Sequence, residues 1–535
     1  MKEQASKFLK TILCLSGFSL GFIVSASYCN YFKSYWYPPT NVWDEGYFIP
    51  AAAKYIEGIH FMEPHPPLGK LLIAASELLL RPLTKQDSTE GLEYYEEASL
   101  ALPAGFTPTG YRFLPVLFSC FNALLFSLLL LKLLDSAFLA LVFSSLYLFE
   151  NSLIVQSRAA MLEGFLLFGV LLCLNAFFSF LNLDFSKTKN KKLWGLSFLM
   201  ALGLLIAFMT KVLGLFLLVL WPLLYVLKFR DKKKLFLKFG LLSAFVVILG
   251  FHGIWYTHFK LTPKIQVTSP NGGMYGASAD LEKVLLGLPR DFGEVTAFYI
   301  QLRDNIEWFR SYERAVQSLS LKNNTASTGS FPIMWPMGSS PIMIRSDLIP
   351  SSVGKSHQYL YFIPNALSWF FALFALVVSV GILCVQFFWK ERVLSPRVSS
   401  YLFALLVLYF SYMLPMLFIR RELFLYHYLS PLLLTFLMLA LLWKDAFFNR
   451  EIFKKYSIPL TLFFTVGVIA SFSFFKPLTY MEGLSCKEAN ARALFRFWDL
   501  RFYGCPDPAD RVMRLEERKR DYRIVVPGEP YPSAL

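Results

Sequence analysis

Residues 160–182 read AMLEGFLLFGVLLCLNAFFSFLN, and the only charged residue in this run is Glu163, near its start. A helix needs about 20 mostly apolar residues to cross the hydrocarbon core of a bilayer. Ten further apolar runs near this length are spread over the 535 residues: 8–28, 111–131, 137–150, 194–209, 213–228, 236–256, 361–388, 398–418, 424–443 and 456–475. We therefore expect an all-α polytopic membrane protein with about 11 transmembrane helices, of which the short run 137–150 is tilted or partly re-entrant.

The composition supports a membrane protein and argues against a nucleic-acid partner. Hydrophobic residues make up 56% of the chain and charged residues 17%, whereas soluble domains carry about 25% charged residues. The formal net charge of +15 comes from short basic clusters between the apolar runs. Since basic and aromatic residues do not alternate along a polar face, we expect no nucleic acid to bind.

The basic clusters also predict the orientation in the membrane. The clusters are Lys2, Lys7 and Lys10; Lys187, Lys189, Lys191 and Lys192; Lys228, Arg230, Lys232, Lys233, Lys234 and Lys238; Lys390, Arg392 and Arg397; and Lys444, Arg450, Lys454 and Lys455. With eleven crossings all of them fall on one side, which the positive-inside rule makes cytoplasmic. The first run lacks a convincing small-residue cleavage site, so we expect it to remain as an anchor.

This orientation divides the chain into four parts. We expect an N-terminal transmembrane module at 1–256 with an external loop at 29–110, and C-terminal transmembrane helices at 361–475. A second external loop covers 257–360, where the amphipathic stretches 281–288 and 300–312 suit interfacial helices. The tail 476–535 is external as well.

The cysteines divide in the same way. Cys486 and Cys505 lie in the external tail, where a disulfide between them is left open by the sequence because their separation is not visible there. Four others lie in apolar runs and are expected to be small buried hydrophobes: Cys14, Cys120, Cys173 and Cys384. The spacings CxxC and HExxH do not occur, so we expect no zinc site.

The first external loop carries adjacent carboxylates beside the membrane. It opens with Trp43-Asp44-Glu45 and closes with a turn stiffened by Pro64, Pro66 and Pro67. Carboxylates at a bilayer surface are costly unless they face water or a partner, which makes this pair a candidate site. The structural alternative is a helix N-cap, where a carboxylate favours the helix dipole.

Charged residues also gather at the external ends of other runs. They are Arg112, Arg158, Glu163, Lys211, Arg420, Arg421, Glu422 and His427. Each cation taken alone is explained by a side chain that anchors its helix at the interface. Because they collect on the face that carries the two carboxylates, we expect them to hold an anionic ligand.

Five segments, in order along the chain, resemble the dolichyl-phosphate-mannose–protein mannosyltransferases. They are Trp43-Asp44-Glu45 with His65-Pro66-Pro67-Leu68-Gly69-Lys70; Tyr111-Arg112-Phe113-Leu114-Pro115; Ser157-Arg158 through Phe168; Thr210-Lys211-Val212-Leu213-Gly214-Leu215; and Arg421-Glu422-Leu423-Phe424-Leu425-Tyr426-His427-Tyr428. Glu163 replaces the family's usual Asp and Val212 its usual Trp. The loop 257–360 is too short for the β-trefoil of the eukaryotic members, so the resemblance implies a prokaryotic enzyme in a bacterial inner membrane, with its active site facing the periplasm.

The resemblance implies a GT-C glycosyltransferase fold and transfer of mannose from a polyprenyl-phosphate donor to a protein Ser or Thr hydroxyl. It implies an inverting reaction without an obligatory metal or other cofactor, in which Asp44 is the general base and Glu45 helps to position the acceptor. Its donor phosphate or sugar pocket would contain Arg112, Arg158, Lys211, Arg421 and His427. Loop support would come from His65, Lys70 and Glu163.

Two alternatives remain open. The enzyme alternative is transfer of another lipid-linked sugar to lipid A or to an envelope glycan. The non-enzyme alternative is a transporter or flippase, which would show internal repeats and charges at mid-helix. Neither of these features is present in the sequence, and the charges gather at one face instead.

Overall fold

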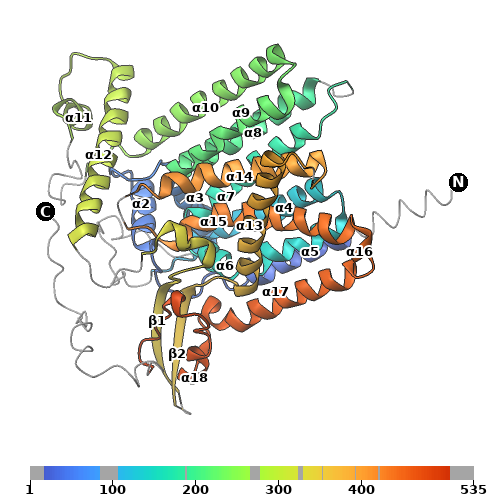
Figure 1. Cartoon of the computed structure of the whole chain (residues 1–535). Helices are drawn as coiled ribbons and strands as arrows, with labels where there is room; N and C mark the ends of the chain where they lie inside the picture. Colours follow the sequence, from blue (N-terminus) through green and yellow to red (C-terminus); the bar gives the residue numbers. More distant parts are fainter. Residues whose placement is uncertain are drawn as a thin grey trace.

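The computed structural model describes most of the chain and consists mainly of helices with one small sheet (Figure 1). The described residues are 17–84, 106–186, 190–265, 277–322, 329–351, 354–391, 393–419 and 422–505.

Nine segments among these residues are long and apolar enough to cross a membrane. They are α4 (Thr109–Leu134), α7 (Glu163–Leu181), α8 (Asn190–Thr210), the η3–α9–η4 segment (Val212–Phe229), α10 (Lys233–Leu261), α13 (Ala366–Phe388), α14 (Pro396–Met416), the η7–α15–η8 segment (Leu425–Phe448) and α17 (Ser457–Tyr480). A tenth span is the bent pair α5 (Ala137–Leu148) and α6 (Asn151–Ser157), whose axes differ by 63°.

These ten spans coincide with ten of the eleven expected runs, so the expected fold class is confirmed. The bend between α5 and α6 accounts for the short third run. Residues 17–27 of the first run are helical, and its remainder lies outside the described residues. Most spans run between the end that carries β1 and β2 and the end that carries α16 (Glu451–Lys454) (Figure 1).

The spans form a buried centre surrounded by outer helices. The apolar window of Leu425–Phe448 is 94% buried inside the protein, whereas that of α10 is 11% buried. At the centre, α7 and α8 approach closely through Gly169 and Gly203, because a Cβ on Gly169 would lie 2.6 Å from the Gly203 carbonyl oxygen. Small residues at such crossings let helix backbones pack together where the hydrophobic effect supplies no driving force between helices.

The outer helices expose apolar side chains in the manner of a surface that faces lipid. This arrangement corrects one expectation for the cysteines. Cys173 is buried in α7 and Cys120 is partly buried, but Cys384 is exposed because α13 packs against its neighbours with one face only. Cys14 lies outside the described residues.

Shorter elements gather at the end of the bundle that carries the sheet. After the first run come α2 (Glu45–Glu57) and α3 (Leu68–Thr84), and the second external loop contributes α11 (Ala279–Leu285), α12 (Glu294–Lys322) and η6 (Pro332–Met337). The helices α11 and α12 cover both stretches that were expected to be amphipathic helices. Their position at the interface stays a prediction.

A three-stranded antiparallel sheet in order β1-β2-β3 was not foreseen by the sequence analysis. It consists of β1 (Ile342–Ser351), β2 (Gly354–Phe362) and the two-residue β3 (Gly483–Leu484). Tyr359 and Tyr361 point from β2 into a small core with Phe475 and Trp498. Tyr359 and Tyr361 are two residues apart, so they lie on the same face of the strand.

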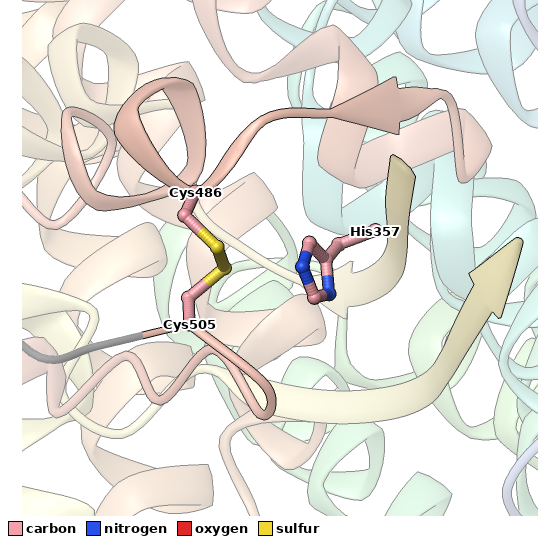
Figure 2. A group of neighbouring side chains, drawn as sticks. All are labelled: His357, Cys486 and Cys505. Carbon is pink, nitrogen blue, oxygen red and sulfur yellow. A yellow bond between two sulfur atoms is a disulfide. The ribbon is translucent and has the colours of Figure 1, made fainter. Parts of the chain in front are cut away.

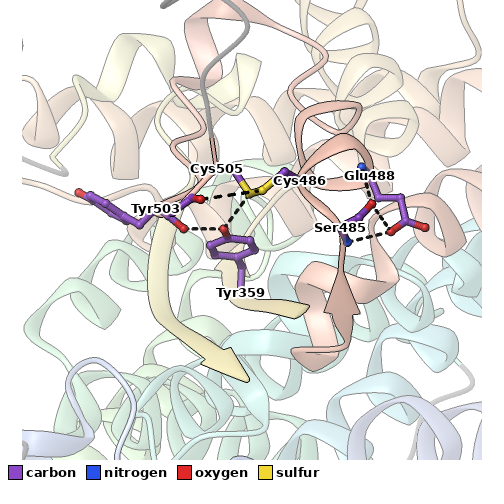
Figure 3. The surroundings of a disulfide bond; sticks show 7 residues. Tyr359, Ser485, Cys486, Glu488, Tyr503 and Cys505 are labelled. Carbon is purple, nitrogen blue, oxygen red and sulfur yellow. Dashed lines mark hydrogen bonds between the residues drawn. A yellow bond between two sulfur atoms is a disulfide. The ribbon is translucent and has the colours of Figure 1, made fainter. Parts of the chain in front are cut away.

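The tail is fastened to this sheet. Cys486 and Cys505 form a disulfide with a Cα–Cα distance of 5.2 Å, which the sequence had left open. The Tyr359 hydroxyl donates to the Tyr503 carbonyl oxygen at 2.6 Å, and Ser485 caps α18 (Cys486–Asn490) (Figure 3). The disulfide and this hydrogen bond therefore hold the chain after α17 against β2.

Candidate active site

The carboxylate of Glu45 and the guanidinium of Arg112 form a buried, two-pronged ion pair. Arg112 Nε donates to Glu45 Oε1 and Arg112 Nη2 to Glu45 Oε2, both at 2.7 Å. The remaining guanidinium N–H groups reach the carbonyl oxygens of Trp36, Pro38 and Thr40. All five donors of Arg112 are therefore taken up by protein acceptors.

Each of these two Glu45 oxygens also accepts one hydrogen bond from a backbone N–H. The Ala160 N–H donates to Oε1 at 2.6 Å and the Val42 N–H to Oε2 at 2.9 Å. Neither Glu45 nor Arg112 is exposed. The pair therefore ties the turn before α2 to α4 and to the segment that follows α6.

This burial bears on two sequence-based assignments. Glu45 was expected to help position the acceptor and Arg112 to contact the donor phosphate. In this conformation both side chains are buried and their hydrogen-bonding groups are taken up by protein partners, although Arg112 borders a narrow cavity. Their geometry is that of a clamp on the turn at residues 36–45.

Asp44 differs sharply from its neighbour. It is half-buried and occupies the N-cap position of α2, yet its side chain makes no capping hydrogen bond. Its backbone carbonyl accepts the first helical hydrogen bonds, from the N–H groups of Tyr47 and Phe48. The helix-cap explanation of this carboxylate thus lacks the contact on which it depends.

The residue before Asp44 has an unusual backbone. Trp43 has a φ of 47°, in the left-handed region that side chains with a Cβ seldom adopt. Its indole meets the Phe424 ring edge-on at 5.5 Å, which links the first external loop to the segment before α15 (Leu429–Trp443). Strain of this kind persists where the surroundings enforce it, and it is common at functional sites.

A second ion pair joins three other segments. Lys211, at the break between α8 and η3, pairs with Glu163 Oε1, and the Gln156 side-chain amide donates to Glu163 Oε2 at 2.8 Å. The Lys211 ammonium lies 5.1 Å from the centre of the Tyr426 ring, which stacks on His427 at 4.5 Å. Glu163 and Lys211 are both buried.

The His-Pro-Pro loop packs directly beside this second pair. A Cβ at Gly69 would lie 2.7 Å from a Leu162 methyl, so a larger residue there would force the Leu162 side chain to shift. Lys70 is fully buried and pairs with Glu63; burial lowers the pKa of Lys70, and the Glu63 carboxylate opposes that shift. The His65 ring lies 6.0 Å from that of Phe48 on α2. His65 and Lys70 lie in or beside this loop, Glu163 lies on α7, and their role in supporting the loop stays a prediction.

Arg158 belongs to the Arg112 side of the site. Its guanidinium donates to the carbonyl oxygens of Lys33 and Ser34 at 2.7 and 2.6 Å and lies 4.9 Å from the Tyr480 ring centre. Arg112 and Arg158 line one narrow cavity between the turn and the end of α17. Arg421, together with Arg420, lies outside the described residues.

The structure also reveals site residues that the sequence analysis did not assign. Gln156 orients Glu163, as described above. Glu150 occupies the break between α5 and α6, fully buried, and accepts hydrogen bonds from the Asn365 N–H, the Ser368 hydroxyl and the Trp369 indole. A lone acid in an apolar run is a detectable signal, since it is costly there without partners.

One group of three side chains among the described residues has the composition of a metal site. His357, Cys486 and Cys505 offer ligand atoms within 4.8 Å of one another (Figure 2). Both sulfur atoms belong to the disulfide, so neither is a thiolate. Metal binding by cysteine requires the thiolate, and in this state the group therefore offers the imidazole alone.

Comparison with known proteins gives consistent matches along the chain. A family model described as dolichyl-phosphate-mannose-protein mannosyltransferase matches residues 21–264, and one described as the C-terminal four TMM region of protein-O-mannosyltransferase matches residues 309–498. Together they cover both halves of the membrane bundle.

Individual relatives align over shorter segments. Protein O-mannosyl-transferase 1 of Danio rerio is 30% identical over 155 residues, which is 29% of this chain and 20% of the relative. Dolichyl-phosphate-mannose--protein mannosyltransferase 4 of Saccharomyces cerevisiae is 25% identical over 235 residues, or 38% of this chain and 30% of the relative. The matched segments thus span less than a third of these relatives.

The overall fold is similar to a solved structure over almost its whole length. A chain of the S. cerevisiae protein O-mannosyltransferase Pmt1-Pmt2 complex bound to the sugar donor superposes with a TM-score of 0.71, covering 95% of each chain at 13% identity. At that identity the likeness establishes a shared fold.

Proposed function

The chain belongs to the dolichyl-phosphate-mannose-protein mannosyltransferase family, and from this we propose that it transfers mannose from a polyprenyl-phosphate carrier to a Ser or Thr hydroxyl of a protein. The observation that carries the proposal is the contrast between two adjacent carboxylates. The Glu45 carboxylate is fully buried in the clamp with Arg112, whereas the Asp44 carboxylate is only half-buried at the head of α2. The hydrogen bonds of Glu45 therefore hold the turn in which Asp44 lies.

In the proposed reaction Asp44 is the general base. As the acceptor hydroxyl attacks the anomeric carbon of the sugar, its proton passes to the Asp44 carboxylate, and the bond to the phosphate oxygen breaks. A single displacement of this kind inverts the anomeric configuration. A positioned general base typically contributes about 10²- to 10⁴-fold to the rate.

The leaving phosphate gains negative charge, so fixed cations stabilise the transition state more than the ground state. We assign this role to Lys211 and Arg158, with Arg421 and His427 as further candidates for the donor pocket. We assign Arg112 and Glu45 to positioning, because their hydrogen bonds hold the turn that carries Asp44. A direct phosphate contact by Arg112 would require breaking the clamp.

We further propose that the site faces the outside of the cytoplasmic membrane of a bacterium. The support is the distribution of Lys and Arg, which gathers at the ends of the spans opposite to Asp44. A polyprenyl-phosphate sugar would then lie with its tail in the bilayer and its phosphate at the level of α2. No cofactor or metal takes part in the proposed reaction.

The second candidate, transfer of another lipid-linked sugar to lipid A or to an envelope glycan, uses the same base and cations. The two candidates differ in the sugar that is transferred and in the acceptor, and the acceptors are distinguished by the following experiment. Purified enzyme is incubated with labelled polyprenyl-phosphate mannose together with a protein mixture and lipid A. Label in protein supports mannosyl transfer to protein, and label in lipid alone replaces it with the second candidate.

The catalytic assignment is tested by Asp44→Asn, with Asp280→Asn on α11 as a matched control of the same chemical change. We expect the turnover of Asp44→Asn to fall by about 10²-fold or more, at unchanged thermal stability and donor affinity. The control should retain its turnover. An Asp44→Asn enzyme that is as active as the parent would remove Asp44 from the mechanism.

A further inference from the structure

A polar cavity lies at the opposite end of the spans from Asp44. Its volume is about 630 Å³, and it lies where the ends of α4, α7 and η4 (Tyr225–Phe229) meet the start of α14. Its lining residues are Asp135, Leu181, Asn182, Leu227, Lys228, Pro396, Arg397, Ser400 and Tyr401. Two helices of the candidate active site, α4 and α7, reach this cavity, each with the end opposite to its site residue.

Hydrogen bonds to neighbouring residues fix the Arg397 side chain at this cavity. Its Nη1 pairs with Asp135 at 2.5 Å and its Nε donates to the Tyr401 hydroxyl at 2.9 Å, while Tyr401 donates in turn to Asn182. The Arg397 side chain is nevertheless 47% exposed. Its Nη2 also donates to the Lys132 carbonyl oxygen at 3.4 Å, so three protein acceptors fix the guanidinium. Because the side chain is still partly exposed, its remaining N–H groups can donate to a phosphate.

A second source of positive charge lies close by. The ammonium groups of Lys228 and Lys232 lie 5.4 and 4.8 Å from the centre of the Phe185 ring. The two cations are therefore close to the same side chain. Asp184 faces them and Asp135 faces Arg397, which leaves an excess of positive charge around the cavity. A neighbouring cavity of about 140 Å³, on which Arg397 also borders, adds Lys444 together with Asp445.

Two of the elements that border the cavity also expose apolar side chains. On α14 the side chains of Phe403, Phe410 and Leu414 are exposed, and they recur at helical spacing after Ser400. On the adjoining Val212–Phe229 span Leu218 and Val226 are exposed, and α14 packs against this span. A phospholipid has a charged headgroup and apolar acyl chains. The positively charged cavity matches the first, and the exposed apolar side chains of the two elements match the second.

We propose that this cavity binds the headgroup of an anionic phospholipid, with the acyl chains along the seam between α14 and the Val212–Phe229 span. The basic clusters mark this end of the bundle as the cytoplasmic one, where anionic lipids attract Lys and Arg. The headgroup phosphate would bridge Arg397 and Lys228, which lie on different elements. A bound lipid therefore stabilises the junction of α4, α7, η4 and α14.

The test uses the full chain in detergent after removal of native lipid. We expect phosphatidylglycerol to raise the melting temperature more than phosphatidylcholine with the same acyl chains, and the difference to shrink at high salt. Equal shifts for the two lipids would overturn the proposal. An equal shift with inorganic phosphate would overturn the lipid assignment and leave a simple anion site.

Variants locate the effect. The double variant Lys228→Gln/Arg397→Gln should bind phosphatidylglycerol about 30-fold more weakly, as expected for two cations near a membrane surface. Lys454→Gln on α16, an exposed cation at the same end outside the cavity, should bind as the parent does. Because the double variant also breaks the Asp135 pair, Ser400→Trp provides an independent test by filling the cavity with all charges retained. Undiminished binding in both variants would refute the site.

Discussion

Replacing Glu45 by glutamine should destabilise the protein far more than the same change one residue earlier. Four donors converge on the Glu45 carboxylate, two on each oxygen: Arg112 Nε and the Ala160 N–H on Oε1, Arg112 Nη2 and the Val42 N–H on Oε2. Glutamine supplies one carbonyl oxygen. In either orientation of the amide, two buried donors face its NH₂ group and lose their acceptor.

The magnitude follows from these contacts. A buried donor left without an acceptor costs about 1–3 kcal/mol, and more when it is charged. Removing one partner of a buried ion pair costs about 3–5 kcal/mol, because the remaining charge stays buried. We therefore expect Glu45→Gln to lose about 3–5 kcal/mol of stability. Asp44→Asn keeps the size of a half-buried side chain that makes no capping bond, and it should therefore lose clearly less stability than Glu45→Gln.

The assay is thermal unfolding of both variants in the same detergent and at the same scan rate, with turnover measured on the same samples. Scan rate is held constant because membrane proteins often unfold irreversibly. The double variant Glu45→Gln/Arg112→Met should be less destabilised than the sum of its single changes, since the unpaired charge is gone. A Glu45→Gln protein as stable as the parent would refute the clamp.

Three further outcomes are expected. In a background without the free cysteines, Val295→Cys on α12 should react with an impermeant maleimide added outside, and Ile452→Cys on α16 only after permeabilisation; the reverse labelling would invert the topology. Burial lowers the pKa of His60 from 6.5 to about 4, so between these values only the unfolded chain takes up the proton. Roughly 3 kcal/mol of stability is therefore lost as the pH falls from about 6.5 to 4, and melting curves of His60→Phe should show a flatter pH dependence there. Cys505→Ser should remove about 3 kcal/mol of stabilisation, since the disulfide with Cys486 closes 19 residues of chain, and faster proteolysis between α17 and residue 505 is the readout.

The spans were predictable because hydropathy depends on local composition. A run such as 160–182 has to be a helix in a bilayer, whatever its neighbours are, since its backbone must satisfy its own hydrogen bonds. The break at 148–151 was also visible as a run too short to cross. The hairpin of β1 and β2 was missed because its alternation is short and lies in a polar loop, where pairing with a distant segment decides whether a strand forms.

The candidate site, too, was predictable from the sequence only in part. Chain order and residue type were enough to single out the segments around Asp44, Arg112, Glu163 and Lys211, because charged groups beside lipid are costly and few. Residue chemistry does not distinguish Asp44 from Glu45, since both are carboxylates in the same turn, and only the family resemblance gave them different roles. Only the folded chain brings the Ala160 N–H and the Arg112 guanidinium, from positions more than 60 residues away, onto one of them. Hydrogen bonds between such distant segments depend on tertiary packing, which buries Glu45 as a clamp and leaves Asp44 half-buried at the head of α2.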